Sequence, residues 1–375
     1  MEKLKLMTIV GTRPEIIKLS ETIKKCDIYF NHIFVHTGQN YDYKLNEVFF
    51  KDLQIRKPDY FLNVADEKLG KTIGNIIAGS YELMSKENPD AVLILGDTNS
   101  CLSAISAKRL KIPIFHMEAG NRCFDENLPE EVNRRIVDHI SDVNLCYTEH
   151  ARRYLNAEGL PKERTYVVGS PMNEILTVNL EKIKSSSILD DLKIEKNKFI
   201  LLSAHREENI DIEKNFLTLM NSVNAIADNI NLPVIYSTHP RSQNYIIKRN
   251  FKFHKNVIIS EPFGFFDYNN LQLNAFCVVS DSGTLAEEAS FFKFPAVSIR
   301  TSTERPEALD KGNFIIGGIS EESVTQSIKI ATEMANNKDF GIEVPDYKDL
   351  NVSIKVVKLI QSYTDIINKT VWRKS

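Results

Sequence analysis

The 375-residue sequence lacks several features that define common protein classes. Its five cysteines are widely scattered, with no CxxC pair and no metal-type spacing to histidine, so we expect reduced cysteines and no bound metal. No apolar run is long enough to span a bilayer, and the N-terminus leads into a strand-like segment without a cleavable signal. We therefore expect a cytoplasmic protein that does not bind membranes.

The sequence also has no large excess of positively or negatively charged residues. Lys and Arg together number 47 and Asp and Glu 50, which gives a formal net charge of −3. This balance argues against nucleic acid or an anionic membrane as the main partner, so any charged ligand must be met by local groups. With 42% hydrophobic residues and a length beyond that of one ordinary core, the chain is expected to form two globular domains.

Alternating apolar and helical segments predict a doubly wound parallel α/β sheet in each half of the chain. The predicted strands are residues 4–10, 32–38, 92–95, 112–115, 143–149 and 165–171 in the first half, and 199–205, 232–240, 256–260, 276–283 and 295–300 in the second. We assign residues 1–172 to the first domain and 173–349 to the second. The helix predicted within 350–375 is expected to pack back on the first domain.

The turn after the first predicted strand carries neither a GxGxxG motif nor a Walker loop. Arg13 and Lys18 lie on the helix that this turn begins, and a helix N-terminus is a usual place for an anionic ligand. The alternative is that both cations are solvated surface charges.

Residues 93–134 hold most of the candidate catalytic groups. Asp97, Glu118 and Arg122 follow two predicted buried strands, and ligands bind at the carboxyl ends of such strands. Because Glu118 comes directly after an apolar run, we expect a partly buried carboxylate that needs a partner. Asp97 could instead be the N-cap of the following helix.

The segment PEEVNRR begins a helix with proline at its front. Glu130 and Arg134 are four residues apart there and share a helix face, although such a pair alone would be a solvated surface salt bridge. Cys123, in the same stretch, is better explained as a small filler than as a nucleophile, because no base can be assigned to it.

The second half has polar strand ends of its own. His205 closes one predicted strand, and its charged neighbours favour a cleft position over a structural role. Backbone N–H groups in the turn at Ser282 and Gly283 could hold a diphosphate, with a plain capped turn as the alternative. Glu288 is placed to accept hydrogen bonds from ribose, and Arg305 offers a cation for phosphate.

The sequence resembles the non-hydrolysing UDP-N-acetylglucosamine 2-epimerase family in seven motifs, in the family's order and approximate spacing: GTRPEIIK, LGDTNS, HMEAGNR, PEEVNR, SAHREE, SDSGTLAEEA and TERPEA. The resemblance covers residues 5–315. It implies two Rossmann-like domains of the glycosyltransferase-B type that face each other across a cleft, a UDP-sugar substrate and a homodimer. Because glycosyltransferases share this fold, the fold alone does not establish the function.

The resemblance also implies a reaction. The family inverts C2 of a UDP-2-acetamido sugar by eliminating UDP to a 2-acetamidoglucal and adding UDP back, which requires no cofactor and no metal. In this sequence the resemblance gives acid/base roles to Asp97, Glu118 and Glu130, UDP departure to His205, and substrate binding to Arg13, Lys18, Arg134, Ser282, Gly283, Glu288 and Arg305.

The stretch at 118–155 resembles the capsule and O-antigen branch that converts UDP-2-acetamido-2,6-dideoxy-L-talose to UDP-N-acetyl-L-fucosamine. The alternatives are a UDP-N-acetylglucosamine 2-epimerase that gives UDP-N-acetylmannosamine, a glycosyltransferase of the same fold, and a silent nucleotide-sugar sensor. Asn40 and Asp42 replace residues typical of substrate-activated epimerases, so activation by a second UDP-N-acetylglucosamine is not expected. Thr284 stands where the family often has a second glycine.

Overall fold

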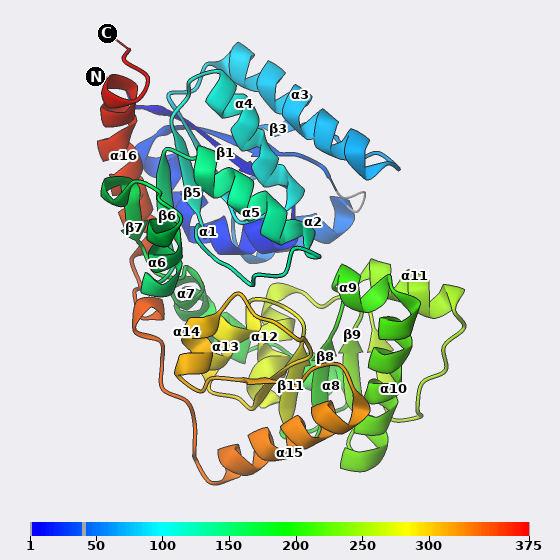
Figure 1. Cartoon of the computed structure of the whole chain (residues 1–375). Coiled ribbons are helices and arrows are strands. Elements are labelled where there is room, and N and C mark those ends of the chain that lie inside the picture. The colour runs from blue at the N-terminus through cyan, green and yellow to red at the C-terminus, as the bar shows by residue number, and fades with distance from the viewer. Residues whose placement is uncertain (1, 40–42, 375) are drawn as a thin grey trace. The chain divides into compact units, whose positions relative to one another are not determined.

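The computed structural model describes residues 2–39 and 43–374. The chain divides into two compact units (Figure 1). Unit 1 comprises Met1–Thr177 and Pro345–Ser375, and unit 2 comprises Val178–Val344. The change of unit falls inside helix α7 (Met172–Lys184). The domain limits inferred from the sequence stay a prediction, and the two units are described separately.

Unit 1 is built on a seven-stranded parallel sheet with the order β3-β2-β1-β4-β5-β6-β7. Its strands are β1 (Lys5–Val10), β2 (Asn31–His36), β3 (Tyr60–Phe61), β4 (Ala91–Leu95), β5 (Ile114–Met117), β6 (Val143–Cys146) and β7 (Thr165–Val167). The central strands are covered on both faces, which is why their sequences are continuous apolar runs. The edge strand β3 has only two residues and is absent from the sequence-based assignment, because so short a segment has no apolar period.

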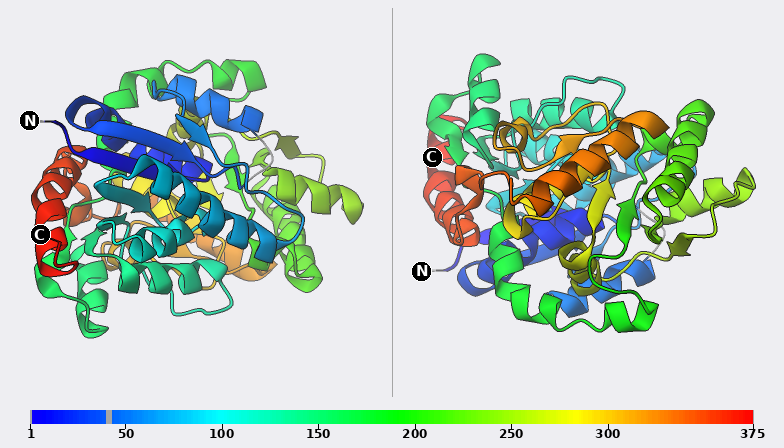
Figure 2. Two further views of the ribbon diagram at one scale, coloured as in Figure 1. Left: turned by 90° about the horizontal axis from the view of Figure 1, so that it is seen from above. Right: turned by 90° about the horizontal axis from the view of Figure 1, so that it is seen from below.

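Helices cover both faces of this sheet (Figure 2). They are α1 (Arg13–Tyr29), α2 (Tyr43–Asp52), α3 (Leu69–Glu87), η1 (Asn99–Leu102), α4 (Ser103–Arg109), α5 (Pro129–Ile140), α6 (Glu149–Ala157), η2 (Lys162–Arg164), η3 (Pro345–Tyr347) and α16 (Val352–Thr370). Helices α3, α4 and α5 pack in sequence along one face, and α1 contacts both α2 and α16 on the other. The C-terminal helix α16 is therefore part of unit 1.

Unit 2 contains a six-stranded parallel sheet with the order β10-β9-β8-β11-β12-β13. Its strands are β8 (Ile200–Ser203), β9 (Val234–Ser237), β10 (Val257–Ser260), β11 (Cys277–Ser280), β12 (Ala296–Ser298) and β13 (Ile315–Ile316). Its helices are α8 (Ile188–Leu192), α9 (Glu207–Ile210), α10 (Glu213–Ile230), α11 (Pro240–Lys248), α12 (Phe265–Asn274), α13 (Leu285–Phe292), α14 (Pro306–Asp310) and α15 (Glu321–Asn336). A fully buried core that includes Leu202, Phe216 and Val279 joins the sheet to α10.

Each sheet has one point where the strand order reverses, and ligands bind at the carboxyl ends of the strands beside such a point. In unit 1 it lies between β1 and β4, and in unit 2 between β8 and β11. The fold class expected from the sequence is confirmed, with two parallel α/β units of the glycosyltransferase-B type.

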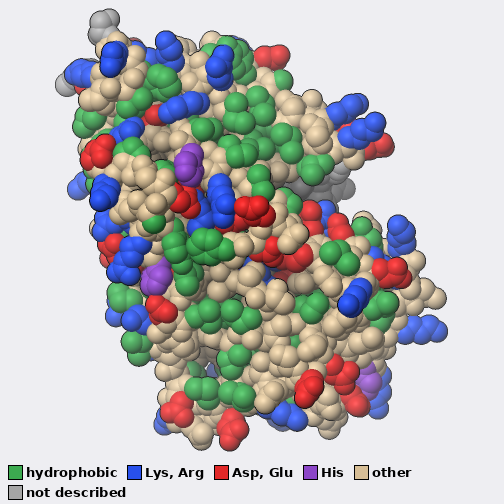
Figure 3. Space-filling view, viewed as in Figure 1, with side chains coloured by type: hydrophobic (Ala, Val, Ile, Leu, Met, Phe, Trp, Pro, Cys, Tyr) green, Lys and Arg blue, Asp and Glu red, His purple; other side chains and the backbone are tan. Residues whose placement is uncertain are grey.

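Side chains of both charges are interspersed on the face shown in Figure 3. In the part of the chain that the structure describes, no helix is long and apolar enough to cross a membrane.

Candidate active site

Glu118 directly follows β5 and lies beside a lysine from α1. Its two carboxylate oxygens accept hydrogen bonds from Lys18 Nζ at 2.9 and 2.7 Å, and both side chains are more than nine-tenths buried. The Tyr147 hydroxyl and the Asn121 amide contact the same carboxylate at 3.4 Å. Lys18 is therefore not a solvated surface charge, and the expectation of a buried Glu118 with a partner is confirmed. Substrate binding by Lys18 stays a prediction.

The backbone at Glu118 is strained, because its φ of +66° lies in the left-handed region that side chains other than glycine rarely adopt. Gly120, two residues later in the same turn, has a φ of +83°. A Cβ at this position would lie 2.5 Å from the carbonyl oxygen of Ala151. Such strain persists only where the surroundings over-determine it, and it is common at functional sites.

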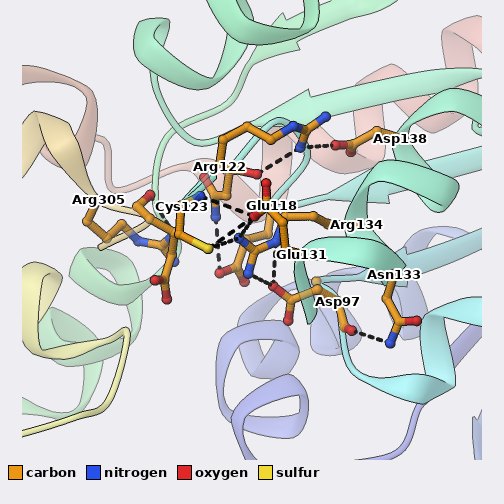
Figure 4. Close-up of polar contacts among 12 residues, drawn as sticks. Asp97, Glu118, Arg122, Cys123, Glu131, Asn133, Arg134, Asp138 and Arg305 are labelled. Carbon is orange, nitrogen blue, oxygen red and sulfur yellow. Dashed lines mark hydrogen bonds and ion pairs between the residues drawn. The ribbon is translucent and has the colours of Figure 1, made fainter. Parts of the chain in front are cut away.

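Asp97 follows β4, and its carboxylate contacts Arg134 of α5 (Figure 4). Asp97 Oδ2 accepts hydrogen bonds from Arg134 Nε at 3.0 Å and Nη2 at 2.5 Å, and the Asp97 side chain is 21% exposed. The N-cap of η1 is Thr98, so the alternative role of Asp97 as a helix cap is wrong. The Asp97 carboxylate is thus bonded to a buried cation and is still exposed enough to contact a ligand.

Arg134 also donates to Glu131 Oε2 at 2.8 Å and is only 2% exposed. The surface salt bridge considered for Arg134 is therefore wrong. Glu131, fully buried, accepts the backbone N–H of Cys123 at 3.1 Å and fixes the start of α5.

Burial raises the pKa of the Cys123 thiol, which disfavours the thiolate that a nucleophile needs. The acid/base role of Glu130, half-buried in the first turn of α5, stays a prediction.

Glu15 joins the turns after β1 and β4, although the sequence analysis does not single it out. Its carboxylate is 1% exposed and accepts hydrogen bonds from Gly11 N at 3.0 Å, Thr12 Oγ1 at 2.7 Å, Thr98 Oγ1 at 3.2 Å and Ser100 Oγ. Burial raises the pKa of Glu15, and these hydrogen bonds offset part of the rise. The TxxE spacing at its helix start, typical of a capping box, is the signal that marks it.

Arg13 begins α1 and is half-buried, with its guanidinium carbon 6.0 Å from the centre of the Phe49 ring. Arg122, placed at the ligand-binding edge by the sequence, is instead 1% exposed. Its guanidinium donates to Asp138 at 2.7 Å and to both oxygens of Glu158 at 2.8 and 2.7 Å. The structure corrects the placement of Arg122 among the ligand-binding groups, because its guanidinium is bonded to these two carboxylates.

In unit 2, His205 lies just beyond β8 and Asp281 just beyond β11, so both lie at the reversal of strand order. The buried Asp281 carboxylate accepts the backbone N–H groups of His205 at 2.8 Å and Arg206 at 2.9 Å. Asp281 Oδ1 lies 3.3 Å from His205 Nδ1, and the imidazole is 39% exposed. The sequence did not single out Asp281, which holds the His205 loop in place.

The turn at Ser282 and Gly283 packs against Glu304. A Cβ at Gly283 would lie 2.7 Å from Glu304 Oε1, so only glycine fits there without a shift. Glu304 accepts hydrogen bonds from Arg206 at 3.1 Å and Arg300 at 2.7 Å. The Ser282 hydroxyl accepts the N–H of Thr284 at 3.3 Å, which closes the turn, whereas Thr284, the N-cap of α13, makes no side-chain cap hydrogen bond among the described residues.

The two further binding candidates are buried. Glu288 of α13 is 6% exposed and accepts a hydrogen bond from Gln272 at 2.5 Å. Arg305 is 1% exposed, with its Nη2 3.5 Å from Glu287 Oε1. Their contacts with UDP stay predictions. Among residues 2–39 and 43–374, no cluster of three His, Cys, Asp or Glu side chains could hold a metal ion.

Two parallel α/β units, each with polar groups at its reversal point, define a fold of the glycosyltransferase-B type. The family model described as UDP-N-acetylglucosamine 2-epimerase matches residues 23–361. The chain belongs to the UDP-N-acetylglucosamine 2-epimerase family, whose members are isomerases.

Solved structures agree with this assignment. The chain is similar to a UDP-N-acetylglucosamine 2-epimerase from Rickettsia bellii, with 50% identity, 100% of both chains covered and a TM-score of 0.92. It is also similar to the Methanocaldococcus jannaschii enzyme in complex with UDP-GlcNAc and UDP, with 31% identity, 96% and 100% coverage and a TM-score of 0.90. A Pseudomonas aeruginosa UDP-2,3-diacetamido-2,3-dideoxy-D-glucuronate 2-epimerase is 33% identical, over 87% of this chain and 92% of that protein.

Proposed function

We propose that this protein inverts C2 of a UDP-2-acetamido sugar by eliminating UDP and adding it back. The observation that carries the proposal is the placement of Asp97 and Glu118 at the ends of the neighbouring strands β4 and β5, each with its own cation. An inversion needs proton transfer on both faces of C2, and two separately held carboxylates supply it. Family membership supports the same reaction.

In the proposed elimination, a carboxylate takes the C2 proton and the C2–H electron pair forms the C1=C2 bond. The C1–O bond breaks, and its electron pair leaves with UDP. In the re-addition a second carboxylic acid protonates C2 from the opposite face, and a UDP oxygen forms the bond to C1. The three proposed groups are Asp97, Glu118 and Glu130. The sum is redox-neutral, so the proposal requires no nicotinamide, and it requires no metal because cationic side chains can balance the diphosphate charge.

Unit 2 is proposed to bind UDP. The Ser282–Gly283 turn lies at the reversal of strand order, where a diphosphate can meet backbone N–H groups at the start of α13. His205 is proposed to assist UDP departure, with Glu288 and Arg305 as further UDP contacts. We also propose that the protein forms a homodimer in the cytoplasm.

For the substrate we propose UDP-2-acetamido-2,6-dideoxy-L-talose, on the motif segment at 118–155, with UDP-N-acetyl-L-fucosamine as product for a capsule or O-antigen. UDP-N-acetylglucosamine is the second candidate, and the names of the two similar structures favour it. The Pseudomonas relative, named for a different sugar, indicates that similar chains act on different UDP-2-acetamido sugars.

Each candidate sugar can be tested separately by proton NMR without an acceptor. We expect the talose derivative to convert, as seen in its anomeric signal, without added UDP-N-acetylglucosamine. Asn40 and Asp42, on which the absence of activation rests, lie outside the described residues. Conversion of UDP-N-acetylglucosamine alone would contradict the proposed sugar, and an absolute need for it as activator would contradict the regulatory proposal. Accumulating free UDP would indicate a hydrolase, and dependence on an acceptor a glycosyltransferase.

Chemistry and anchoring in unit 2 can be separated by two variants. His205→Ala is expected to lower kcat more than it weakens UDP binding, because its side chain is proposed to act as UDP leaves. Arg305→Ala is expected to weaken UDP binding roughly tenfold or more, the scale of a lost charged hydrogen bond. Titration calorimetry and turnover give both values. Lys198→Ala, an exposed cation paired with Glu195, is the control, and the reverse ordering would contradict the division.

A further inference from the structure

A buried chain of charged groups runs behind the two carboxylates of unit 1. His116 on β5 is fully buried, as is Asp138 on α5. His116 Nδ1 lies 2.9 Å from Asp138 Oδ1, and His116 Nε2 lies 2.8 Å from the carbonyl oxygen of Gly96. Asp138 Oδ2 accepts a hydrogen bond from Arg122 at 2.7 Å, and Figure 4 shows this contact.

Both ring nitrogens of His116 face groups that can only accept. A carbonyl oxygen has no proton to give. Burial would raise the pKa of Asp138, but the hydrogen bonds and charges of His116 and Arg122 outweigh it and hold this pKa below its usual value. With Asp138 as a carboxylate, the geometry presents an acceptor to each ring nitrogen of His116, the Asp138 oxygen to Nδ1 and the Gly96 carbonyl oxygen to Nε2.

This chain of contacts reaches the backbone on both sides of the site. Gly96, whose carbonyl accepts from His116, immediately precedes Asp97. Asp138 also accepts the N–H of Gly120, at 3.2 Å from each oxygen, two residues after the strained Glu118. A single ion pair thus contacts the turn that carries each carboxylate.

We propose that His116 and Asp138 are positioning residues that fix Asp97 and Glu118 relative to each other. This inference rests on the proposed function, in which both carboxylates act on one C2 atom. Groups that exchange protons with the same carbon tolerate little displacement, and a shift of about 1 Å can lower a rate by roughly a hundredfold. Neither side chain needs to touch the substrate.

Asp138→Asn tests the proposal with little change in size. An amide has one acceptor oxygen, so an N–H donor would face either His116 or Arg122. We expect kcat to fall by roughly tenfold or more with KM changed less than about threefold, since the substrate contacts are intact.

Asp142→Asn is the matched control. This carboxylate is also buried and accepts from the backbone of Ile114 at 3.0 Å and from Lys108 at 2.7 Å, at the opposite end of β5. Its loss is expected to lower the thermal midpoint without changing kcat. Equal effects of the two variants on kcat, or an unchanged kcat in folded Asp138→Asn, would overturn the proposal.

Nitrogen-15 NMR of histidine-labelled protein supplies a test that does not depend on turnover. We expect the His116 signals, identified by their absence from His116→Gln, to show two protonated nitrogens at neutral pH. A neutral ring in the wild-type protein would overturn the proposal even if Asp138→Asn fails to fold. An imidazolium in a protein without epimerase activity would instead count against the proposed function.

Discussion

Replacement of Glu118 by glutamine is expected to lower kcat about a hundredfold or more, the usual scale for a lost acid/base group. Glutamine keeps the shape of the side chain but cannot exchange a proton with C2. It also leaves the buried Lys18 ammonium beside a neutral amide, and breaking a buried ion pair commonly costs about 3–5 kcal/mol of stability. We expect losses in kcat of similar size from Asp97→Asn and Glu130→Gln.

The stability cost must be separated from the chemical one. Circular dichroism and UDP titration report whether Glu118→Gln is folded, and UDP binding is expected to persist because its proposed contacts lie in unit 2. Glu126→Gln is the control, since this carboxylate is 75% exposed and pairs with Arg135 at 3.1 Å. Near-normal turnover of folded Glu118→Gln would remove Glu118 from the mechanism.

The fold could be predicted because the buried parallel strands have sequences that are continuous apolar runs. The run at 92–95 became β4 and the run at 199–205 contains β8. The two-residue edge strands β3 and β13 carry no comparable signal, since their pairing depends on neighbours far away in the chain. Periodicity also cannot give the strand order, and the order decides which turns lie at the two reversal points.

The candidate site was predictable to the extent that its residues follow strands. This rule located Asp97, Glu118 and His205, but not the groups that hold them. Asp138 and Asp281 are distant in sequence from most of their partners, and nothing in their local pattern separates a buried counter-charge from a surface carboxylate. The same limit led Arg122 to be placed with the ligand-binding groups, whereas two carboxylates enclose it.

The partners change the chemistry expected of each group. The sequence motifs give Lys18 and Arg134 a role in binding the substrate. In the structure, however, Lys18 pairs with Glu118 and Arg134 pairs with Asp97. A carboxylate that accepts hydrogen bonds from a fixed cation is held in one orientation, which suits proton transfer at a fixed carbon. The return of a proton then falls to a group on the opposite face of the sugar, and this requirement distinguishes elimination and re-addition from a mechanism that never breaks the C2–H bond.

Turnover in D2O tests the central claim most directly. We expect the product to contain one deuterium at C2, because the C2 proton leaves to one carboxylate and a different, solvent-exchanged acid protonates the glucal from the other face. Mass spectrometry gives the label count, and proton NMR gives its position and the inverted configuration. A product that carries a single deuterium at C2 is the predicted result, and an inverted product that retains its original C2 hydrogen would contradict the account.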